Sequence, residues 1–312
     1  MSLSLFWIAF FIAGGIALLF YCGNLLVRGA ASLAMRKGLS RMTVGLTLVA
    51  LGTSAPEFFV SLLAGVKGSS EISIGNIMGS NIANIALILG FSAALRPMLV
   101  QRRTLRFEMP FVMASSLIFY LFALGGRIAR WEGLVLIALL ALFLTYCVRT
   151  AREKHPHIGM VTLVGNLKTD LFCIVVGLVG LTAGSEMFVR GASSLARMLG
   201  VSEYAIGLTV VALGTSLPEF GASIVAIVRK ETEISVGNVI GSNIFNILFV
   251  LGTVSTIRPL YCPPEALQVD LPMMILTAAT AYVFLYSQKN LARWEGVFLM
   301  ATYAAYLAII AW

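Results

Sequence analysis

The sequence predicts an all-α membrane protein in which ten transmembrane helices form two inverted five-helix repeats. Of its 312 residues, 59% are hydrophobic and 12% are charged, and the mean hydropathy is +0.94. Soluble globular domains are far more polar than this. A second observation, a long internal repeat, divides the chain into two related halves.

Ten apolar stretches have about the 18–25 residues that a membrane-spanning helix needs. They lie at 5–27, 42–66, 72–95, 107–126, 130–149, 169–189, 204–228, 233–257, 270–287 and 293–311. If both termini face outside, sixteen of the 22 Lys and Arg residues fall in loops predicted inside and six in loops predicted outside. This asymmetry satisfies the positive-inside rule, so topology explains the net charge of +8 without a nucleic-acid partner. We expect a multi-pass protein of the plasma (inner) membrane.

The second half of the chain repeats the first. Residues 45–58 (GLTLVALGTSAPEF) match residues 207–220 (GLTVVALGTSLPEF) at twelve of fourteen positions. Residues 71–90 match residues 233–252 at thirteen of twenty positions. Because five spans are an odd number, the second copy must enter the membrane from the opposite side, as in many secondary transporters.

Three segments follow from this repeat. The first five-helix repeat comprises residues 1–150, with its motif region at 45–90. Residues 151–168 are predicted to form a cytoplasmic linker. The second repeat comprises residues 169–312, with its motif region at 207–252.

Each half carries Gly-Thr-Ser-x-Pro-Glu inside an apolar segment. A carboxylate at the centre of a membrane helix is unfavourable by about 2.5–3.5 kcal/mol, so Glu57 and Glu219 point to a function. Pro56 and Pro218 should break their helices, and the carbonyls freed there must face protein or a wet cavity. A Thr one turn before each Glu and a Ser beside it would add oxygens on the same face. These residues are Thr53, Ser54, Thr215 and Ser216.

The next span of each half carries a polar stripe. Polar residues recur there at intervals of four, which places them on one helix face. They are Asn76, Ser80 and Asn84 in the first half and Asn238, Ser242 and Asn246 in the second. Glycines beside them allow close helix packing in a membrane. These are Gly75, Gly79, Gly237 and Gly241.

Three other acidic residues near the ends of spans are interpreted as structural. Glu186 lies one turn before Arg190, so a local ion pair is expected. Glu132 and Glu295 each follow a Trp at the start of a span and are interpreted as interfacial anchors.

Every candidate ligand in the two motifs is an oxygen atom of a carboxylate, hydroxyl, amide or carbonyl group. Such a set suits hard cations, Ca²⁺ above all and also Na⁺. The motifs hold two carboxylates and no Lys or Arg, so their formal charge is −2 when both are ionised. Hydrogen-bonding between helices is the alternative reading for the Ser, Thr and Asn residues. The duplication of the whole pattern favours a cation site.

At these motifs the chain resembles the sodium/calcium exchanger branch of the cation/Ca²⁺ exchanger superfamily, prokaryotic calcium/sodium antiporters included. That branch carries paired GTSxPE and GNxxGSNIxN patterns. The resemblance implies an antiporter, not an enzyme, that exchanges Na⁺ for Ca²⁺ by alternating access, with the spans at 5–27 and 169–189 sliding across the core. It implies no cofactor and no protein partner; small inorganic cations and the lipid bilayer are the expected partners.

The resemblance also implies roles for single residues. Glu57 and Glu219 would be the central Ca²⁺ ligands, with Thr53 and Thr215 contributing backbone oxygens. The Na⁺ sites would be built by Ala50, Ser54, Ser80, Ala212, Ser216 and Ser242. Asn84 and Asn246 would occupy the remaining central positions.

The driving ion can be argued from two departures. Many members of the family carry Asp where this chain has Asn246, which removes one protonatable group. Proton-driven relatives resemble GNxxE, and Gly79 and Gly241 stand where that Glu would be. The first departure argues against K⁺ co-transport, and the second favours Na⁺ as the driving ion, with a H⁺/Ca²⁺ or other cation antiporter as the alternative. A cation channel could also use buried carboxylates, whereas an intramembrane enzyme is least favoured because no Cys–His or His–Glu pair lies near the motifs.

Overall fold

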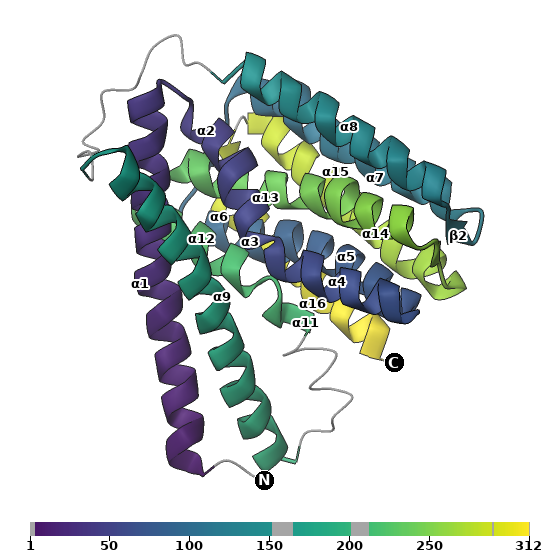
Figure 1. Ribbon diagram of the computed structural model, residues 1–312, viewed down its shortest axis with the longest axis horizontal. Helices are drawn as coiled ribbons and strands as arrows, with labels where there is room; N and C mark the ends of the chain where they lie inside the picture. The colour runs from purple at the N-terminus through teal and green to yellow at the C-terminus, as the bar shows by residue number, and fades with distance from the viewer. Residues whose placement is uncertain (1–3, 152–164, 201–211, 289, 312) are drawn as a thin grey trace.

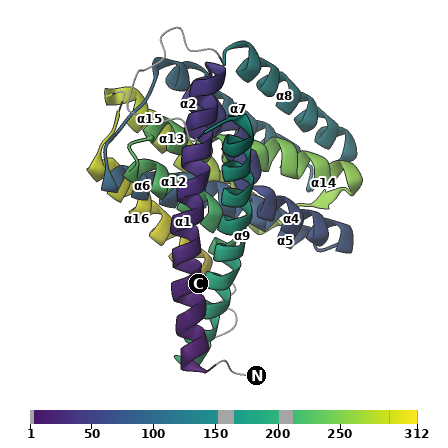
Figure 2. The same cartoon turned by 60° about the vertical axis from the view of Figure 1, so that its left-hand side comes forward.

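The computed structural model describes residues 4–151, 165–200, 212–288 and 290–311, and these fold almost entirely into helices (Figure 1). Two long helices, α1 (Leu5–Lys37) and α9 (Leu167–Met198), run side by side and antiparallel. They extend beyond a bundle that the remaining helices form (Figures 1 and 2). Most of the predicted linker, residues 152–164, lies outside the described residues.

Glycines bring α1 and α9 into backbone contact. A Cβ atom added at Gly15 would lie 2.7 Å from the amide nitrogen of Phe188, and one at Gly177 would lie 2.7 Å from that of Leu26. Distances this short leave no room for a side chain. The two helices therefore pack as one closely fitted pair.

A buried carboxylate joins the same two helices near one end. Asp170 of α9 accepts a hydrogen bond of 2.7 Å from the Ser32 hydroxyl of α1. Its other oxygen lies 2.7 Å from Nε of Arg36, and Nη2 of Arg36 also donates to the Gly165 carbonyl at 2.6 Å. The Asp170 side chain is fully buried, so this ion pair is shielded from solvent.

Both long helices exceed the predicted spans at 5–27 and 169–189. Each predicted span ends directly before a basic residue, Arg28 or Arg190. A charge does not end a helix when nothing breaks the backbone. Helix α1 continues until Gly38, whose φ of 62° supplies a left-handed cap.

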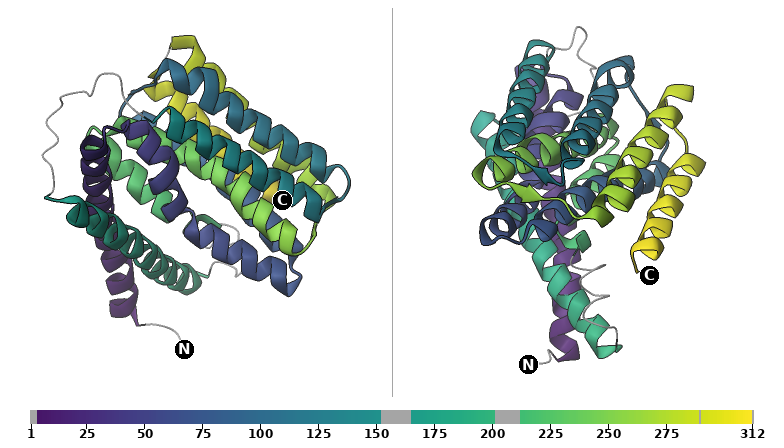
Figure 3. Two further views of the ribbon diagram at one scale, coloured as in Figure 1. Left: turned by 45° about the horizontal axis from the view of Figure 1, so that its top comes forward. Right: turned by 90° about the vertical axis from the view of Figure 1, so that its right-hand side faces the viewer.

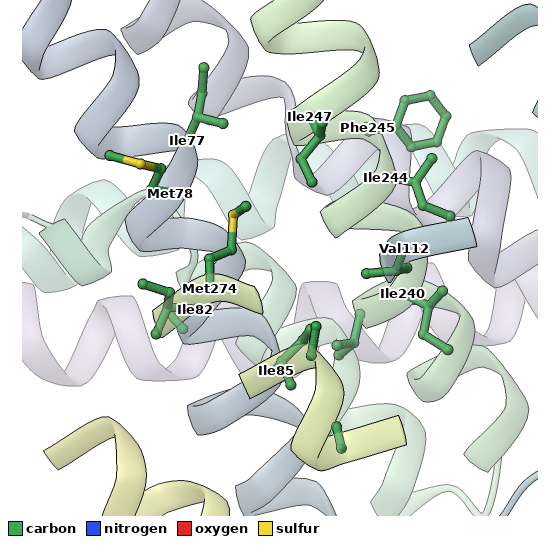
Figure 4. Packing of buried hydrophobic residues seen from close by; sticks show 14 of the residues in the cluster. Ile77, Met78, Ile82, Ile85, Val112, Ile240, Ile244, Phe245, Ile247 and Met274 are labelled. Atoms are coloured by element: carbon green, nitrogen blue, oxygen red, sulfur yellow. The ribbon is translucent and has the colours of Figure 1, made fainter. Parts of the chain in front are cut away.

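Two helical rods form the centre of the bundle. The first comprises α5 (Ser70–Ile82), η2 (Ala83–Leu89) and α6 (Gly90–Leu95), and the second comprises α13 (Thr232–Ile244), η5 (Phe245–Leu251) and α14 (Gly252–Ile257). In their apolar windows 78% and 94% of residues are buried, against 17% for α1. Their apolar side chains belong to one buried cluster, in which Figure 4 shows Ile82 beside Met274 of α15, and Ile240 and Ile244 beside Val112 of α7.

Each rod is preceded by a broken helix. In the first half this comprises α2 (Arg41–Val44), η1 (Gly45–Val49), α3 (Ala50–Thr53) and α4 (Ala55–Lys67). In the second half the described part comprises α11 (Ala212–Gly214) and α12 (Leu217–Val228). Residues 201–211, which include the start of the second repeated motif, lie outside the described residues.

The outer helices pack on the opposite half. They are η3 (Thr104–Glu108), α7 (Met109–Ala123), α8 (Arg130–Arg149), η6 (Ala266–Asp270), α15 (Leu271–Gln288) and α16 (Arg293–Ala311). A Cβ at Gly133 of α8 would lie 2.6 Å from the Gly252 carbonyl of α14, and one at Gly90 of α6 would lie 2.9 Å from the Gly296 carbonyl of α16. Figure 3 shows the resulting layered bundle beside the long pair.

Two short strand pairs also cross between the halves. Strand β1 (Met98–Leu99) pairs antiparallel with β4 (Asn290–Leu291), and β2 (Arg127–Ile128) pairs with β3 (Leu260–Tyr261). The first registers Met98 opposite Leu291, and the second registers Ile128 opposite Leu260. Each half therefore contributes one strand to each pair.

The interpretation of the peripheral carboxylates is partly revised. Glu186 and Arg190 form the expected ion pair. Glu132 and Glu295 do more than mark the ends of spans, because each accepts a hydrogen bond of 2.7 Å from a backbone amide three residues earlier, that of Ala129 or Ala292. They satisfy amide groups that a helix start leaves unpaired.

The helix count agrees in part with the predicted ten spans. Seven described helices are long and apolar enough to cross a membrane, and the bent pair Arg41–Thr53 and Ala55–Lys67 makes eight. Helix α12 is apolar but shorter, and the predicted span at 204–228 begins in the undescribed segment. Helix α16 coincides with the predicted last span, although it is not among the seven.

The two ion pairs of α9 predict different effects on stability. Asp170→Asn should lower the free energy of unfolding by about 2 kcal/mol, because it removes a buried charge from its partner. Glu186→Gln, in a pair whose side chains are 63% exposed, should change it by less than about 1 kcal/mol. Thermal unfolding of both variants in detergent would measure this difference; equal effects would contradict the structural role of Asp170.

Candidate functional site

Both broken helices are interrupted at the serine of the Gly-Thr-Ser-x-Pro-Glu motif. Ser54 (φ −79°, ψ 8°) and Ser216 (φ −88°, ψ 2°) leave the helical conformation, and α4 and α12 begin immediately afterwards. Pro56 and Pro218 then lie in the first helical turn, where a missing N–H has no consequence. The first break bends its helix by 45°. Both interruptions lie two residues before a motif proline, Pro56 or Pro218.

The serines at the breaks bond to the glutamates of the opposite half. The Ser54 hydroxyl donates to Oε1 of Glu219 at 2.9 Å, and the Ser216 hydroxyl donates to Oε1 of Glu57 at 3.1 Å. Ser80 and Ser242 extend the two networks, through Ser216 at 3.1 Å and through Glu219 at 3.4 Å. The structure thus brings the two predicted motifs together at one place.

The threonines make a second pair of bonds between the halves. Thr53 donates to Oδ1 of Asn238 at 3.1 Å, and Thr215 donates to Oδ1 of Asn76 at 3.2 Å. Asn76 and Asn238 are therefore linking residues, because their amide groups are already occupied by protein partners.

The amide nitrogens of these two asparagines complete the link. Asn76 donates to the Glu57 carbonyl at 3.2 Å and to Ser61 at 2.9 Å. Asn238 donates to the Glu219 carbonyl at 3.2 Å and to Ser223 at 3.0 Å. Ser61 and Ser223 were not among the predicted site residues, although both lie four residues after a motif glutamate and are themselves repeated.

A separate set of buried polar atoms has no hydrogen-bond partner among the described residues. Among the buried polar atoms without such a partner, those on the two motifs and at the ends of the two polar stripes are Oε2 of Glu57, Oε2 of Glu219 and both amide atoms of Asn84 and of Asn246. All four side chains are fully buried. Leaving such a group unpaired is unfavourable by about 1–3 kcal/mol, and by more when it is charged. These atoms are available to a bound group.

No positive side chain balances the glutamates in the part of the chain that the structure describes. The four ion pairs found there all lie elsewhere. Two carboxylates in a medium of low polarity repel each other and are poorly solvated. A cation bound between them would remove both effects, whereas an anion would be repelled.

Asn84 and Asn246 lie in π-helical segments that the sequence analysis did not foresee. Asn84 belongs to η2 and Asn246 to η5, whereas the regular interval of four residues predicted continuous α-helix. π-Helical turns are frequent at functional sites because they leave the backbone hydrogen-bonding pattern irregular. In each polar stripe the first two residues are therefore hydrogen-bonded to protein groups. The amide atoms of the third residue, Asn84 or Asn246, have no hydrogen-bond partner among the described residues.

Two of the motif glycines, both in the second half, lie in close contact with the backbone of the first half. A Cβ at Gly237 would lie 2.7 Å from the Met42 carbonyl, and one at Gly241 would lie 2.5 Å from that of Leu46. No atom of the described residues lies within 4 Å of a Cβ at Gly75 or Gly79. The segment that corresponds to Met42 and Leu46 in the second half is within the undescribed residues 201–211.

The carbonyls near the breaks are partly occupied. The Ala50 carbonyl accepts bonds from the Ser54 amide at 3.0 Å and from the Thr53 hydroxyl at 3.3 Å. Its counterpart Ala212 begins α11 directly after the undescribed segment. The Gly214 carbonyl, which Pro218 frees, accepts a hydrogen bond from Ser185 of α9. As predicted, this freed carbonyl faces protein.

The fold and the site define an integral multi-pass membrane protein with a buried, oxygen-lined and doubly acidic centre. The sequence pattern described as "Sodium/calcium exchanger protein" matches residues 7–149 and 169–312. The chain belongs to this family of transmembrane antiporters.

Individual relatives agree over nearly their full length. The chain is 31% identical to the sodium/calcium exchanger MaX1 of Methanosarcina acetivorans, covering 95% of this chain and 96% of that protein. It is 32% identical to the inner membrane protein YrbG of Escherichia coli, covering 96% and 95%. The solved sodium-calcium exchanger NCX_Mj, soaked with 2.5 mM Na⁺ and 0.1 mM Ca²⁺, superposes with a TM-score of 0.84 at 29% identity, covering 98% of this chain and 99% of that chain.

The Ser185 hydrogen bond predicts a local stabilising role. Ser185→Ala should lower the free energy of unfolding by about 1 kcal/mol, because the Gly214 carbonyl would lose its partner. Ser194→Ala is the matched control, since that hydroxyl bonds back to Arg190 in its own helix. Thermal unfolding in detergent would compare the two; a Ser185→Ala protein as stable as its control would contradict the role.

Proposed function

We propose that the protein exchanges Na⁺ for Ca²⁺ across the plasma (inner) membrane by alternating access. The observation that carries the proposal is the set of open, fully buried oxygens of Glu57, Glu219, Asn84 and Asn246 in a centre without a neighbouring positive charge. Hard cations with several oxygen ligands are the substrates that such a centre fits best. Membership of the exchanger family supports the same reading.

The two classes of oxygen suit the two ions. Glu57 and Glu219 would hold Ca²⁺, because the two carboxylates balance one divalent charge. Asn84 and Asn246 would add neutral oxygens, and the backbones of Thr53 and Thr215 would add carbonyls.

The Na⁺ sites would use the flanking hydroxyls and carbonyls. They comprise Ser54, Ser80, Ser216 and Ser242 with the carbonyls of Ala50 and Ala212. The serine hydroxyls donate to carboxylates or to one another in this structure, and each oxygen keeps lone pairs that a cation could use. Na⁺ and Ca²⁺ would thereby compete for one pair of negative charges, which couples their movement.

The exchange requires that the centre open to each side in turn. We assign the movement to α1 and α9, which are fastened to each other through glycines and through Asp170. Part of their contact with the bundle is apolar, since a Cβ at Gly23 would lie 3.1 Å from Cγ2 of Val225. The hydrogen bond from Ser185 of α9 to the Gly214 carbonyl is a polar contact that sliding of the pair would have to break.

The proposed architecture is ten transmembrane helices in two inverted repeats, residues 1–150 and 169–312, joined by the linker at 151–168. The reciprocal bonds Ser54–Glu219 and Ser216–Glu57 support it, because equivalent residues exchange equivalent partners. The strand pairs and the Gly133–Gly252 and Gly90–Gly296 contacts exchange partners in the same way. The odd number of helices per repeat inverts the second copy, and the even total of ten places both termini on one side, which the basic loops indicate to be outside.

Na⁺ as the driving ion predicts a defined ion-flux result. In vesicles reconstituted with the purified protein, an imposed Na⁺ gradient should drive ⁴⁵Ca²⁺ uptake, whereas a pH gradient of equal size should not. The absence of a Glu at Gly79 and Gly241 is the reason for this expectation. Uptake that follows only the pH gradient would establish the H⁺/Ca²⁺ alternative.

The ligand role predicts a selective loss of transport. Glu57→Gln and Glu219→Gln should each reduce Na⁺-driven ⁴⁵Ca²⁺ uptake to the level of protein-free vesicles, because the centre would keep one charge instead of two. Glu186→Gln, which removes an exposed carboxylate, should transport normally. Size-exclusion profiles would verify folding, and near-normal uptake by either Glu57→Gln or Glu219→Gln would rule out the assignment.

A further inference from the structure

A second polar site lies at the turn between α12 and α13, apart from the buried centre. A cavity of about 260 Å³ is lined there by Arg41, Arg96, Lys230, Glu231 and Glu233, among others. None of the proposed Ca²⁺ or Na⁺ ligands lines it. Its basic residues belong to loops that the sequence predicts on the cytoplasmic side.

The carboxylates of this cavity already have partners, whereas two of its cations do not. Nη1 of Arg41 lies 2.9 Å from Oε2 of Glu231, and Gln101 donates to Oε1 of Glu233 at 2.7 Å. Among the described residues, no carboxylate lies within ion-pair distance of Arg96 or Lys230. Three basic and two acidic side chains line the cavity, so its net formal charge is +1. The carboxylate of Glu233 is paired only with the neutral amide of Gln101.

Positive charge is also crowded beside the cavity. Burial and the nearby Arg28 guanidinium lower the pKa of Arg229, the residue that precedes Lys230, and the Glu231 carboxylate opposes this shift only in part. Like charges held close together in a partly buried place are unfavourable unless an anion separates them.

The backbone at Lys230 is strained. Its φ is 64°, and among the described residues it is the only one other than glycine with a positive φ. This left-handed conformation is unfavourable by about 1–2 kcal/mol for a residue with a Cβ. Glycine would adopt it without strain.

The equivalent turn in the first half has a glycine at this position and is therefore unstrained. Gly68, 162 residues before Lys230, has φ of 90°. The amides of Gly68 and Ser69 close the end of α4 through bonds of 3.0 and 2.9 Å to the carbonyls of Gly65 and Ala64. The amides of Lys230 and Glu231 close α12 in the same way, at 3.0 and 2.8 Å. The fold requires the left-handed residue in both halves, yet only one half uses glycine.

The two turns also differ in how the arginine that faces each of them is bonded. Arg258 packs over Gly68, with Nη2 3.0 Å from where a Cβ would lie, and donates to the Val66 carbonyl at 2.8 Å. Its counterpart Arg96, 162 residues earlier, makes no such bond to Val228 and lines the open cavity instead. At the turn that contains Lys230, the side chains of Lys230 and Arg96 line a basic cavity. At the equivalent turn that contains Gly68, Arg258 packs over the backbone.

We propose that this cavity binds a phosphate group between Lys230 and Arg96, with Arg41 at its margin. A guanidinium matches phosphate oxygens through paired N–H donors, and a lysine ammonium adds a mobile charge. The phosphate belongs either to the headgroup of an anionic lipid in the adjoining leaflet or to free inorganic phosphate.

Two probes separate these sources for the full-length protein. Inorganic phosphate binding is measured by equilibrium dialysis of the detergent-solubilised protein. Lipid binding is measured as the phosphatidylglycerol that stays with the protein after purification from vesicles of equal phosphatidylglycerol and phosphatidylcholine content. Binding of phosphate in detergent supports the free anion, whereas selective retention of phosphatidylglycerol without phosphate binding supports the lipid headgroup.

Four variants test the residues. Arg96→Gln, Lys230→Gln and Lys230→Gly should each weaken the observed binding about fivefold, as expected for the loss of one charge near a phosphate. Arg102→Gln removes an exposed cation of the same predicted face that does not line the cavity, and it should bind as the unmodified protein does. Lys230→Gly should melt at the same or a higher temperature, because glycine relieves the backbone, so weaker binding there cannot be ascribed to unfolding.

Three results would overturn the proposal. The unmodified protein could bind neither probe. Arg96→Gln and both Lys230 variants could bind as tightly as the unmodified protein. Arg102→Gln could weaken binding as much as Arg96→Gln, which would show that net surface charge alone is responsible.

Discussion

Two glutamates that are fully buried in a membrane protein need polar partners, and each of them finds one in the opposite half of the chain. Ser54 bonds to Glu219 and Ser216 bonds to Glu57, so the breaks before the prolines bring the halves together. The Thr53–Asn238 and Thr215–Asn76 bonds hold the same junction through the residues that directly precede these serines. The positions of the broken helices, the central rods and the open asparagines all depend on this exchange of bonds.

These bonds occupy one oxygen of each carboxylate and leave the other open. The occupied oxygens fix the orientation of the side chains, and the open ones define where a cation can be held. Such a division combines rigidity with binding capacity, because a ligand site must be ordered before its ion arrives. In the proposed site, Asn84 and Asn246 would share this role without adding charge, so that the two carboxylates would balance one divalent cation.

Much of this site could be predicted because the motif is written twice. The helix breaks followed from Pro56 and Pro218, and the grouping of Glu, Ser and Thr followed from their spacing along one helix face. The π-helical segments at Asn84 and Asn246 could not be predicted, since their one-residue change of register depends on packing between rods. The lengths of α1 and α9 were underestimated because hydropathy measures where lipid contact ends and not where a helix ends. The bonds of Asp170 to Ser32 and Arg36 join residues that are 138 and 134 positions apart, so no local sequence pattern reveals them.

The exchanged contacts between the halves also bear on how the chain is made. Ribosomes deliver the first half to the membrane before Ser216, Asn238, Gly252 and Gly296 have been synthesised. During that interval the Glu57 carboxylate lacks the hydrogen bond from Ser216. The glycine surfaces of α8 and α6 are not yet covered by α14 and α16. Its packing is completed only when the second half inserts, so the two repeats form one cooperative unit of biogenesis despite their shared sequence.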